Sequence, residues 1–416
     1  NAKQAYTELE PLQRDLGGTP EFDYLFGMAA LDSGRIEDAI IAFERVLALM
    51  PQHAGAQMDL ARAYYAAGSY DLAEAAFVKL RESNPPAPTL AAINRYLDAI
   101  RNRRHEAQAG WSGFGELAVG YDSNITGVPS DFGAAVDRTF GIPGIQPTGN
   151  SIKRAAGFVQ AAAGADYHTP LSAGWSAFGG GSLRGRAYKD ESDFDLADGE
   201  VRVGAQRNLG TDQWRGVASY LPFSQKGAAP GDPQPTNDRR VASLGLDWRR
   251  ALDSKTQVGA SLQFNAVRFP DNRVEDFDQV LVALSWLHSF DRQGAPLVYV
   301  SAFASDDHAK NDLGDGVTKS KNIGGVRSYV QYSLSPKLQA FAGLSGIARR
   351  DKDLGARGLP DQRGRDLYGE ANLGLAWQFR EPCTARIQYL YSRNNSNIDI
   401  YDFNRYEILT AIRCDL

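Results

Sequence analysis

Hydrophobic and polar residues alternate along most of the chain after residue 110. In "RVASLGLDWRR" (240–250), "QVGASLQFNAV" (257–267) and "RYEILTAIRCDL" (405–416), the even-numbered positions are mainly apolar or aromatic. The odd-numbered positions of these stretches are mainly polar, charged or small. A period of two over about ten residues is typical of a strand that crosses an outer membrane with its polar face inward and its apolar face outward.

The connections between the alternating stretches are of two kinds, which themselves alternate. Short turns read "HTPLS", "NLGTDQ", "LDSKTQ", "FDRQGAP", "LSPK" and "FREP". Long polar loops include "PFSQKGAAPGDPQPTN", "SDDHAKNDLGDGVTKSK", "RRDKDLGARGLPDQRGRD" and a first loop of about thirty residues that begins at "SNITGVPSDFG". A soluble sandwich, the competing interpretation, has no reason to place every long loop at one end. Outer-membrane barrels do, with short periplasmic turns and long external loops.

Counting the alternating stretches predicts fourteen strands. They begin near Trp111, Arg154, Gly174, Asp195, Gln213, Asp238, Thr256, Phe277, Pro296, Asn322, Lys337, Asp366, Cys383 and Asn404. An even number of strands returns both ends of the barrel to one side, which we expect to be the periplasm. The sequence therefore predicts a 14-stranded antiparallel transmembrane β-barrel over residues 111–416, surrounded by the lipid of a bacterial outer membrane.

The first hundred residues follow a different pattern, a repeat of 34 residues that is typical of tetratricopeptide repeats. One period is marked by Gly27, Ala39, Phe43 and Pro51, and the next by Ala61, Ala73, Phe77 and Pro85. The alternative is an ordinary pair of helical hairpins. One period before Ala39 lies Ala5, so we expect the chain to open on the second helix of an earlier repeat. Residues 1–107 are thus predicted to form a short helical repeat domain that stacks and binds a client protein on its concave surface.

Composition narrows the function classes. The formal net charge of −5 gives little support to a nucleic-acid partner. The five histidines are scattered without a metal-binding helical pair, and no phosphate-binding or calcium-binding loop is present. We therefore expect no catalytic residues, no cofactor and no metal, and a protein that is not an enzyme.

The first strand carries a short motif, "GYDSN", formed by Gly120, Tyr121, Asp122, Ser123 and Asn124. Placed directly after a small repeat domain, it resembles the surface lipoprotein assembly modulator family. The ending "YLYSRNNSNIDIYDFNRYEI" (389–408) is also similar to that family's last hairpin. The resemblance implies a periplasmic repeat domain, a fourteen-stranded outer-membrane barrel, and transport of lipoproteins or secreted proteins to the cell surface. One departure is the final residue, Leu416, where such barrels more often end in an aromatic residue.

Several functions fit this architecture. The leading hypothesis is a translocation or assembly factor whose repeats capture a periplasmic client. We expect its barrel to be monomeric and to work with assembly machinery. An exopolysaccharide export channel is the alternative; a barrel enzyme and a scaffold that only anchors the repeats are two further classes. The neighbouring genes would separate these client classes.

Charged residues recur at inward positions of the predicted strands. The candidate lumen charges are Arg184, Arg186, Glu200, Arg202, Asp247, Arg249, Glu370, Arg386, Glu407 and Arg413. One interpretation is a rigid, wet lumen of mixed charge; the other is a conduit for a polar or extended substrate. The mixed signs argue against a strongly ion-selective pore, in which one sign should dominate.

The two cysteines, Cys383 and Cys414, belong to the last predicted hairpin. If Tyr391 lies opposite Tyr406, antiparallel pairing places Cys383 opposite Cys414, with both side chains on the outward face. The periplasm is oxidising, so we predict a disulfide, with a free buried pair as the alternative.

Overall fold

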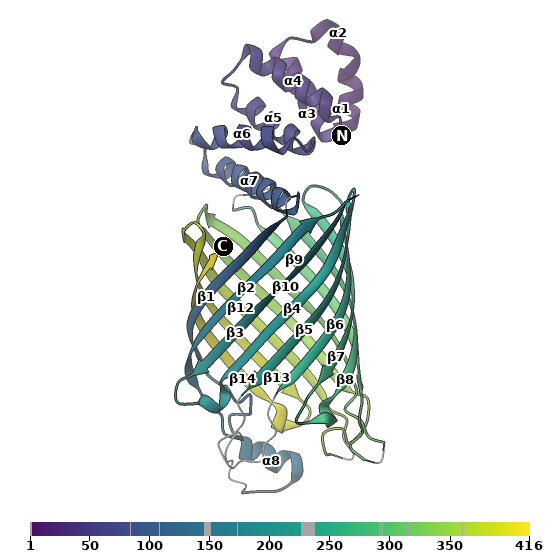
Figure 1. Ribbon diagram of the computed structural model, residues 1–416, viewed down its shortest axis with the longest axis vertical. Helices are drawn as coiled ribbons and strands as arrows, with labels where there is room; N and C mark the ends of the chain where they lie inside the picture. The colour runs from purple at the N-terminus through teal and green to yellow at the C-terminus, as the bar shows by residue number, and fades with distance from the viewer. Residues whose placement is uncertain are drawn as a thin grey trace. The chain divides into compact units, whose positions relative to one another are not determined.

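The structure is a computed structural model that describes residues 2–83, 85–107, 109–144, 151–172, 174–225, 238–290, 292, 294–314, 316–359 and 361–416. The chain divides into two compact units, Asn1–Ala107 and Gln108–Leu416. The first unit is helical and the second is a β-barrel (Figure 1).

Helical hairpins make up the first unit. Its elements are α1 (Ala2–Leu9), η1 (Glu10–Leu12), α2 (Gln13–Leu16), α3 (Pro20–Ser33), α4 (Ile36–Leu49), α5 (Ala54–Ala66), α6 (Tyr70–Glu82) and α7 (Ala87–Ala107). Gly34 ends α3 in the left-handed conformation, at a φ of 86°, which glycine adopts without steric cost. Along the described residues of this unit, no helix is both long enough and apolar enough to cross a membrane.

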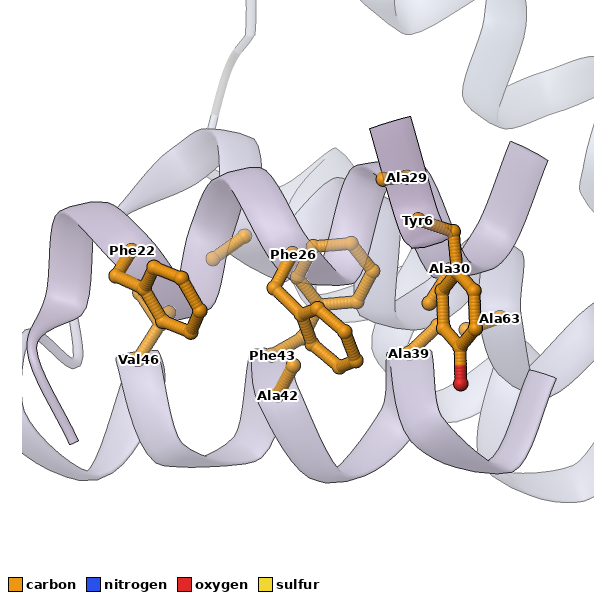
Figure 2. Close-up of a cluster of buried hydrophobic side chains, with 11 residues drawn as sticks. Tyr6, Phe22, Phe26, Ala29, Ala30, Ala39, Ala42, Phe43, Val46 and Ala63 are labelled. Atoms are coloured by element: carbon orange, nitrogen blue, oxygen red, sulfur yellow. The ribbon is translucent and has the colours of Figure 1, made fainter. Parts of the chain in front are cut away.

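One of the two core clusters of the helical unit lies mainly between α3 and α4 (Figure 2), and the other lies among α5, α6 and α7. Phe26, Phe43 and Val46 are buried in the first cluster with small alanines between them. A side chain at Gly27 would place its Cβ 2.6 Å from a ring carbon of Phe43, so only glycine lets the two helices approach this closely. Gly27 and Phe43, two residues of the repeat pattern, therefore serve to pack the helices against each other.

The second unit is a closed barrel of fourteen antiparallel strands in sequence order, with β1 paired to β14 (Figure 1). The strands are β1 (Gly110–Asp122), β2 (Ala156–Pro170), β3 (Trp175–Tyr188), β4 (Leu196–Leu209), β5 (Asp212–Gln225), β6 (Arg239–Ala251), β7 (Thr256–Arg268), β8 (Phe277–Ser289), β9 (Leu297–Ala309), β10 (Lys321–Ser335), β11 (Leu338–Asp351), β12 (Arg365–Arg380), β13 (Cys383–Ser396) and β14 (Phe403–Asp415). The predicted fold class is confirmed, and each predicted strand start lies within two residues of the observed one.

The two faces of each strand differ as the alternation predicted. Outward side chains such as Leu117, Leu183 and Leu284 are 69%, 72% and 68% exposed. In water each would forgo roughly 1.5–3 kcal/mol of burial, whereas lipid hydrocarbon accepts them. A closed sheet with such a surface leaves no unpaired strand edge, which is what spanning a bilayer requires. The barrel is therefore of the outer-membrane type.

Short and long connections lie at opposite rims of the barrel. Gly210 makes the tight turn between β4 and β5 with a φ of 59°. The long-loop rim carries α8 (Phe132–Phe140) and the single turns η3 (Ser192–Phe194), η4 (Arg273–Glu275) and η5 (Asp399–Tyr401). The sequence pattern predicted this first loop as polar and irregular; α8 is a helix within it, and Asp131 caps its start by accepting a hydrogen bond from the Ala134 backbone.

Candidate functional site

The repeat-signature residues form packing contacts within the helical unit. Ala39, Phe43, Ala61, Ala73 and Phe77 are fully buried. Pro51 follows the end of α4, and Pro85 lies between α6 and α7. These residues set the spacing of the helices, and the binding surface has to come from their neighbours.

A row of tyrosines joins α3 and α5, the first helices of two successive hairpins, to the last helix, α7. The Tyr24 hydroxyl on α3 donates a 3.0 Å hydrogen bond to Asp59 on α5, and the ring of Tyr65 on α5 lies 5.2 Å from that of Tyr96 on α7. Burial, followed by the charge of Asp59, raises the pKa of Tyr24. Arg62, 38% exposed, contacts Asp59 at 2.7 Å in the middle of the row. We call these five residues the tyrosine row.

The seam of the barrel, where β1 meets β14, is its shortest strand pairing, with nine residue pairs from Phe114–Asp415 to Asp122–Glu407. At the short-turn end, Gly113 and Leu416 exchange two backbone hydrogen bonds beyond these pairs. In β13 and β14, Cys383 lies opposite Cys414, and the structure joins them in a disulfide. The strand that closes the barrel is thus tied to its neighbour at this end.

At the long-loop end of the seam, the "GYDSN" motif holds β1 to β14. The Asp122 carboxylate accepts hydrogen bonds from Arg405 and from the Asn124 backbone. Ser123 and Tyr406 exchange two hydrogen bonds of 3.0 and 2.8 Å. The Asn124 amide donates to the backbone oxygens of Val128 and Asn404, both at 2.9 Å.

The polar residues of the motif are buried, so the loss of any of these hydrogen bonds would leave a buried group without a partner. Asp122 and Asn124 are fully buried, and Ser123 is nearly so. Gly120 is required for a separate reason: a Cβ there would lie 2.4 Å from the ring of Phe158. Tyr121 points outward and is 42% exposed. We name Asp122, Ser123, Asn124 and Arg405 the seam latch.

Loops at the long-loop rim contact one another beside the latch. Arg138 of α8 forms an ion pair with Asp399 of η5. The loop after β11 turns inward, where Arg357 binds both Asp351, at 2.7 Å, and Asp366, at 2.8 Å. Arg357 also lies 4.9 Å from the ring centre of Tyr401, whose pKa is raised by burial.

The structure brings some predicted lumen charges together and separates others. Arg186 pairs with Glu407 at 2.8 Å, across the inside of the seam, and Arg202 pairs with Glu200 at 2.8 Å. The remaining pairs involve partners that were not singled out from the sequence: Arg184 with Asp198, Arg202 also with Asp166, Arg386 with Glu116, Glu407 also with Arg405, and Arg413 with Asp415. Glu370 accepts a hydrogen bond from Tyr368. Among the residues that the structure describes, Asp247 and Arg249 make no ion pair.

A recurring arrangement in the lumen escaped the sequence analysis. An inward phenylalanine lies over an inward glycine of the next strand, and an arginine stacks on the ring. The sets are Gly120–Phe158–Arg186, Gly164–Phe114–Arg413, Gly204–Phe178–Arg215 and Gly325–Phe303–Arg327. The guanidinium carbons lie 3.8–4.7 Å from the ring centres. The signal in the sequence that could have revealed this arrangement is an inward glycine directly across from an inward aromatic residue on the next strand.

In the parts of the chain that the structure describes, no three His, Cys, Asp or Glu side chains are grouped as metal ligands.

Comparison with known proteins finds similarity in both units. A tetratricopeptide repeat family model matches residues 30–93. The "Surface lipoprotein assembly modifier" of Pasteurella multocida is 23% identical over 58% of this chain, and "Surface lipoprotein assembly modifier 1" of Neisseria meningitidis is 21% identical over 80%. The chain is a relative of the surface lipoprotein assembly modifiers. The matches span 45% and 65% of the lengths of these two modifiers.

The resemblance of the sequence to the modifier family is thereby confirmed. Among solved structures, the outer membrane channel DcaP of Acinetobacter baumannii is similar at a TM-score of 0.46 and 10% identity, covering 75% of this chain and 98% of that one. OmpT of Vibrio cholerae is similar at 0.41 and 10% identity, covering 74% and 98%.

Proposed function

We propose that this protein is an outer-membrane translocation or assembly factor: its repeats capture a periplasmic client, and its barrel helps to deliver that client to the cell surface. The client is a lipoprotein or a secreted protein. The observation that carries the proposal is the union of a tetratricopeptide repeat unit with an outer-membrane-type barrel in a relative of the surface lipoprotein assembly modifiers.

Topology supports a periplasmic position for the repeats. The helical unit ends at Ala107, and β1 begins at Gly110 at the short-turn rim. Short turns of outer-membrane barrels face the periplasm. The repeats therefore emerge where a client that has crossed the inner membrane is available.

The tyrosine row is the surface we assign to client capture. It runs across α3, α5 and α7, and stacked repeats bind their partners on an extended concave surface. Tyrosine rings supply a rigid apolar surface with a polar tip, and Met58 of α5, which is half-buried against the same core cluster as Tyr65 and Tyr96, supplies an adaptable one. An extended segment of an incompletely folded client fits such a surface.

Deleting residues 2–104 tests the proposal. We expect the barrel to insert and to keep its heat-modifiable migration in gels, while surface display of the client is lost. Met58→Ser should weaken display without the deletion, and Leu72→Ser, on the second helix of the same hairpin and 54% exposed, is its control. Unchanged display by the deletion variant refutes capture by the repeats.

The names of the relatives point to an assembly factor rather than to an enzyme. They favour lipoprotein assembly over exopolysaccharide export, which we do not propose.

A further inference from the structure

The lumen-facing acidic residues are more buried in the barrel wall than several of the lumen-facing arginines. Acidic residues on lumen-facing strand positions are buried or half-buried throughout the described chain, apart from Asp415 at the end of β14. Asp122, Asp307 and Asp351 are only 0%, 2% and 5% exposed. By contrast, Arg184, Arg239, Arg249 and Arg327 are exposed to the lumen. A solute in the lumen therefore meets guanidinium groups before it meets carboxylates.

Ion pairing further increases the difference between the cations and the acids that are free to contact a solute in the lumen. Within the described residues, six lumen-facing cations make no ion pair: Arg215, Arg239, Arg249, Lys321, Arg327 and Arg349. Three lumen-facing acids also lack one, namely Asp247, Asp307 and Glu370, and the last two accept hydrogen bonds from neutral side chains. The remaining carboxylates are already engaged by arginines.

Aromatic rings hold most of the unpaired cations in place. Arg215 stacks on Phe178 at 4.4 Å, Arg327 on Phe303 at 4.7 Å, and Arg239 on Phe223 at 4.0 Å from the guanidinium carbon to the ring centre. A planar guanidinium on a ring keeps its N–H edges free for an anion and loses little side-chain entropy on binding one. Such groups are prepared to bind carboxylates or phosphates.

The unpaired cations span the length of the barrel. Arg215 is near the short-turn end of β5, Arg327 is in the middle of β10, and Arg349 is near the long-loop end of β11. An anionic group leaving one of them has another further along the wall.

We infer that the lumen is an anion-preferring passage whose wall accommodates the acidic groups of an extended polypeptide. The formal mixture of signs conceals this preference because most lumen carboxylates are paired within the wall. The inference concerns the barrel alone and does not depend on capture by the repeats.

The test is the current through the purified full-length protein in planar lipid bilayers under a potassium chloride gradient. We expect a reversal potential of the sign that reports chloride preference. Arg215→Gln, Arg327→Gln and Arg349→Gln, made singly, should each shift it toward the non-selective value. Added decaglutamate should block the current more strongly than decalysine.

Arg207→Gln is the matched control. Arg207 also stacks on an aromatic ring, that of Trp175 at 5.3 Å, but on the outward face of the barrel. It should leave the reversal potential unchanged. Cation preference, absence of current, or an equal shift by Arg207→Gln would overturn the inference. Because these readouts need no client, their failure is distinct from loss of surface display.

Discussion

Removing the Asp122 carboxylate should loosen the seam at the long-loop end. Asp122→Ala deletes the partner of Arg405 and the acceptor of the Asn124 backbone N–H; Asp122 and Asn124 are fully buried. Arg405 keeps a weaker contact with Glu407 at 3.5 Å and is itself 31% exposed. Breaking a buried pair costs about 3–5 kcal/mol, and the partial exposure of Arg405 lowers our expectation to about 2–3 kcal/mol.

The measurement is the temperature at which the barrel loses its compact, heat-modifiable form in detergent. Asp122→Ala should unfold at a clearly lower temperature. Asp122→Asn retains an acceptor for the Asn124 N–H and should have an intermediate effect. Asp361→Asn, at an exposed loop position, serves as the control. If Asp122→Ala unfolds at the same temperature as the control, the seam latch does not stabilise the barrel.

Two further predictions concern opposite ends of the chain. Mass spectrometry of the unreduced protein should find Cys383 and Cys414 linked, and Cys383→Ser should cost about 3 kcal/mol, because the bond closes a loop between residues 31 apart; two freely alkylated thiols would contradict it. In the helical unit, the hydrogen bond to Asp38 is the first cause that raises the pKa of Tyr6 to about 12. Folding thus favours the neutral phenol of Tyr6. The stabilisation of the fold by this phenol is complete below about pH 10 and is lost as the pH rises toward 12. Circular dichroism of the helices should show less destabilisation over that range for Tyr6→Phe, and an identical pH profile would refute this account.

The strands were predictable because a strand in a bilayer must alternate, and because Gly, Pro, Asp and Ser mark every turn. The register of the last hairpin was also accessible: a single assumed pair, Tyr391 with Tyr406, places Cys383 opposite Cys414, which is the pairing in the structure. Local patterns decide both features.

Partner choice inside the lumen could not be predicted in the same way. Arg186 of β3 reaches Glu407 of β14 across two intervening strands, β1 and β2. That contact depends on the closure of the sheet and on the combined registers of three strand pairs. The seam latch was visible as a family signature, but its role depends on β14, about 280 residues away. α8 was not predicted because it has only nine residues, and its small and charged residues resemble those of the polar loop around it.

The six tryptophans all lie near the short-turn ends of their strands, from Trp111 at the start of β1 to Trp377 toward the end of β12. They point outward, and Trp214 and Trp248 lie 6.4 Å apart on neighbouring strands. Tryptophan favours the boundary between hydrocarbon and headgroups. The intrinsic fluorescence of the protein is therefore an optical marker of one leaflet. Brominated lipid in the leaflet that faces the short turns would quench nearly all of the emission, and the same lipid in the opposite leaflet would quench little, so the unlabelled protein can report its own orientation in a vesicle.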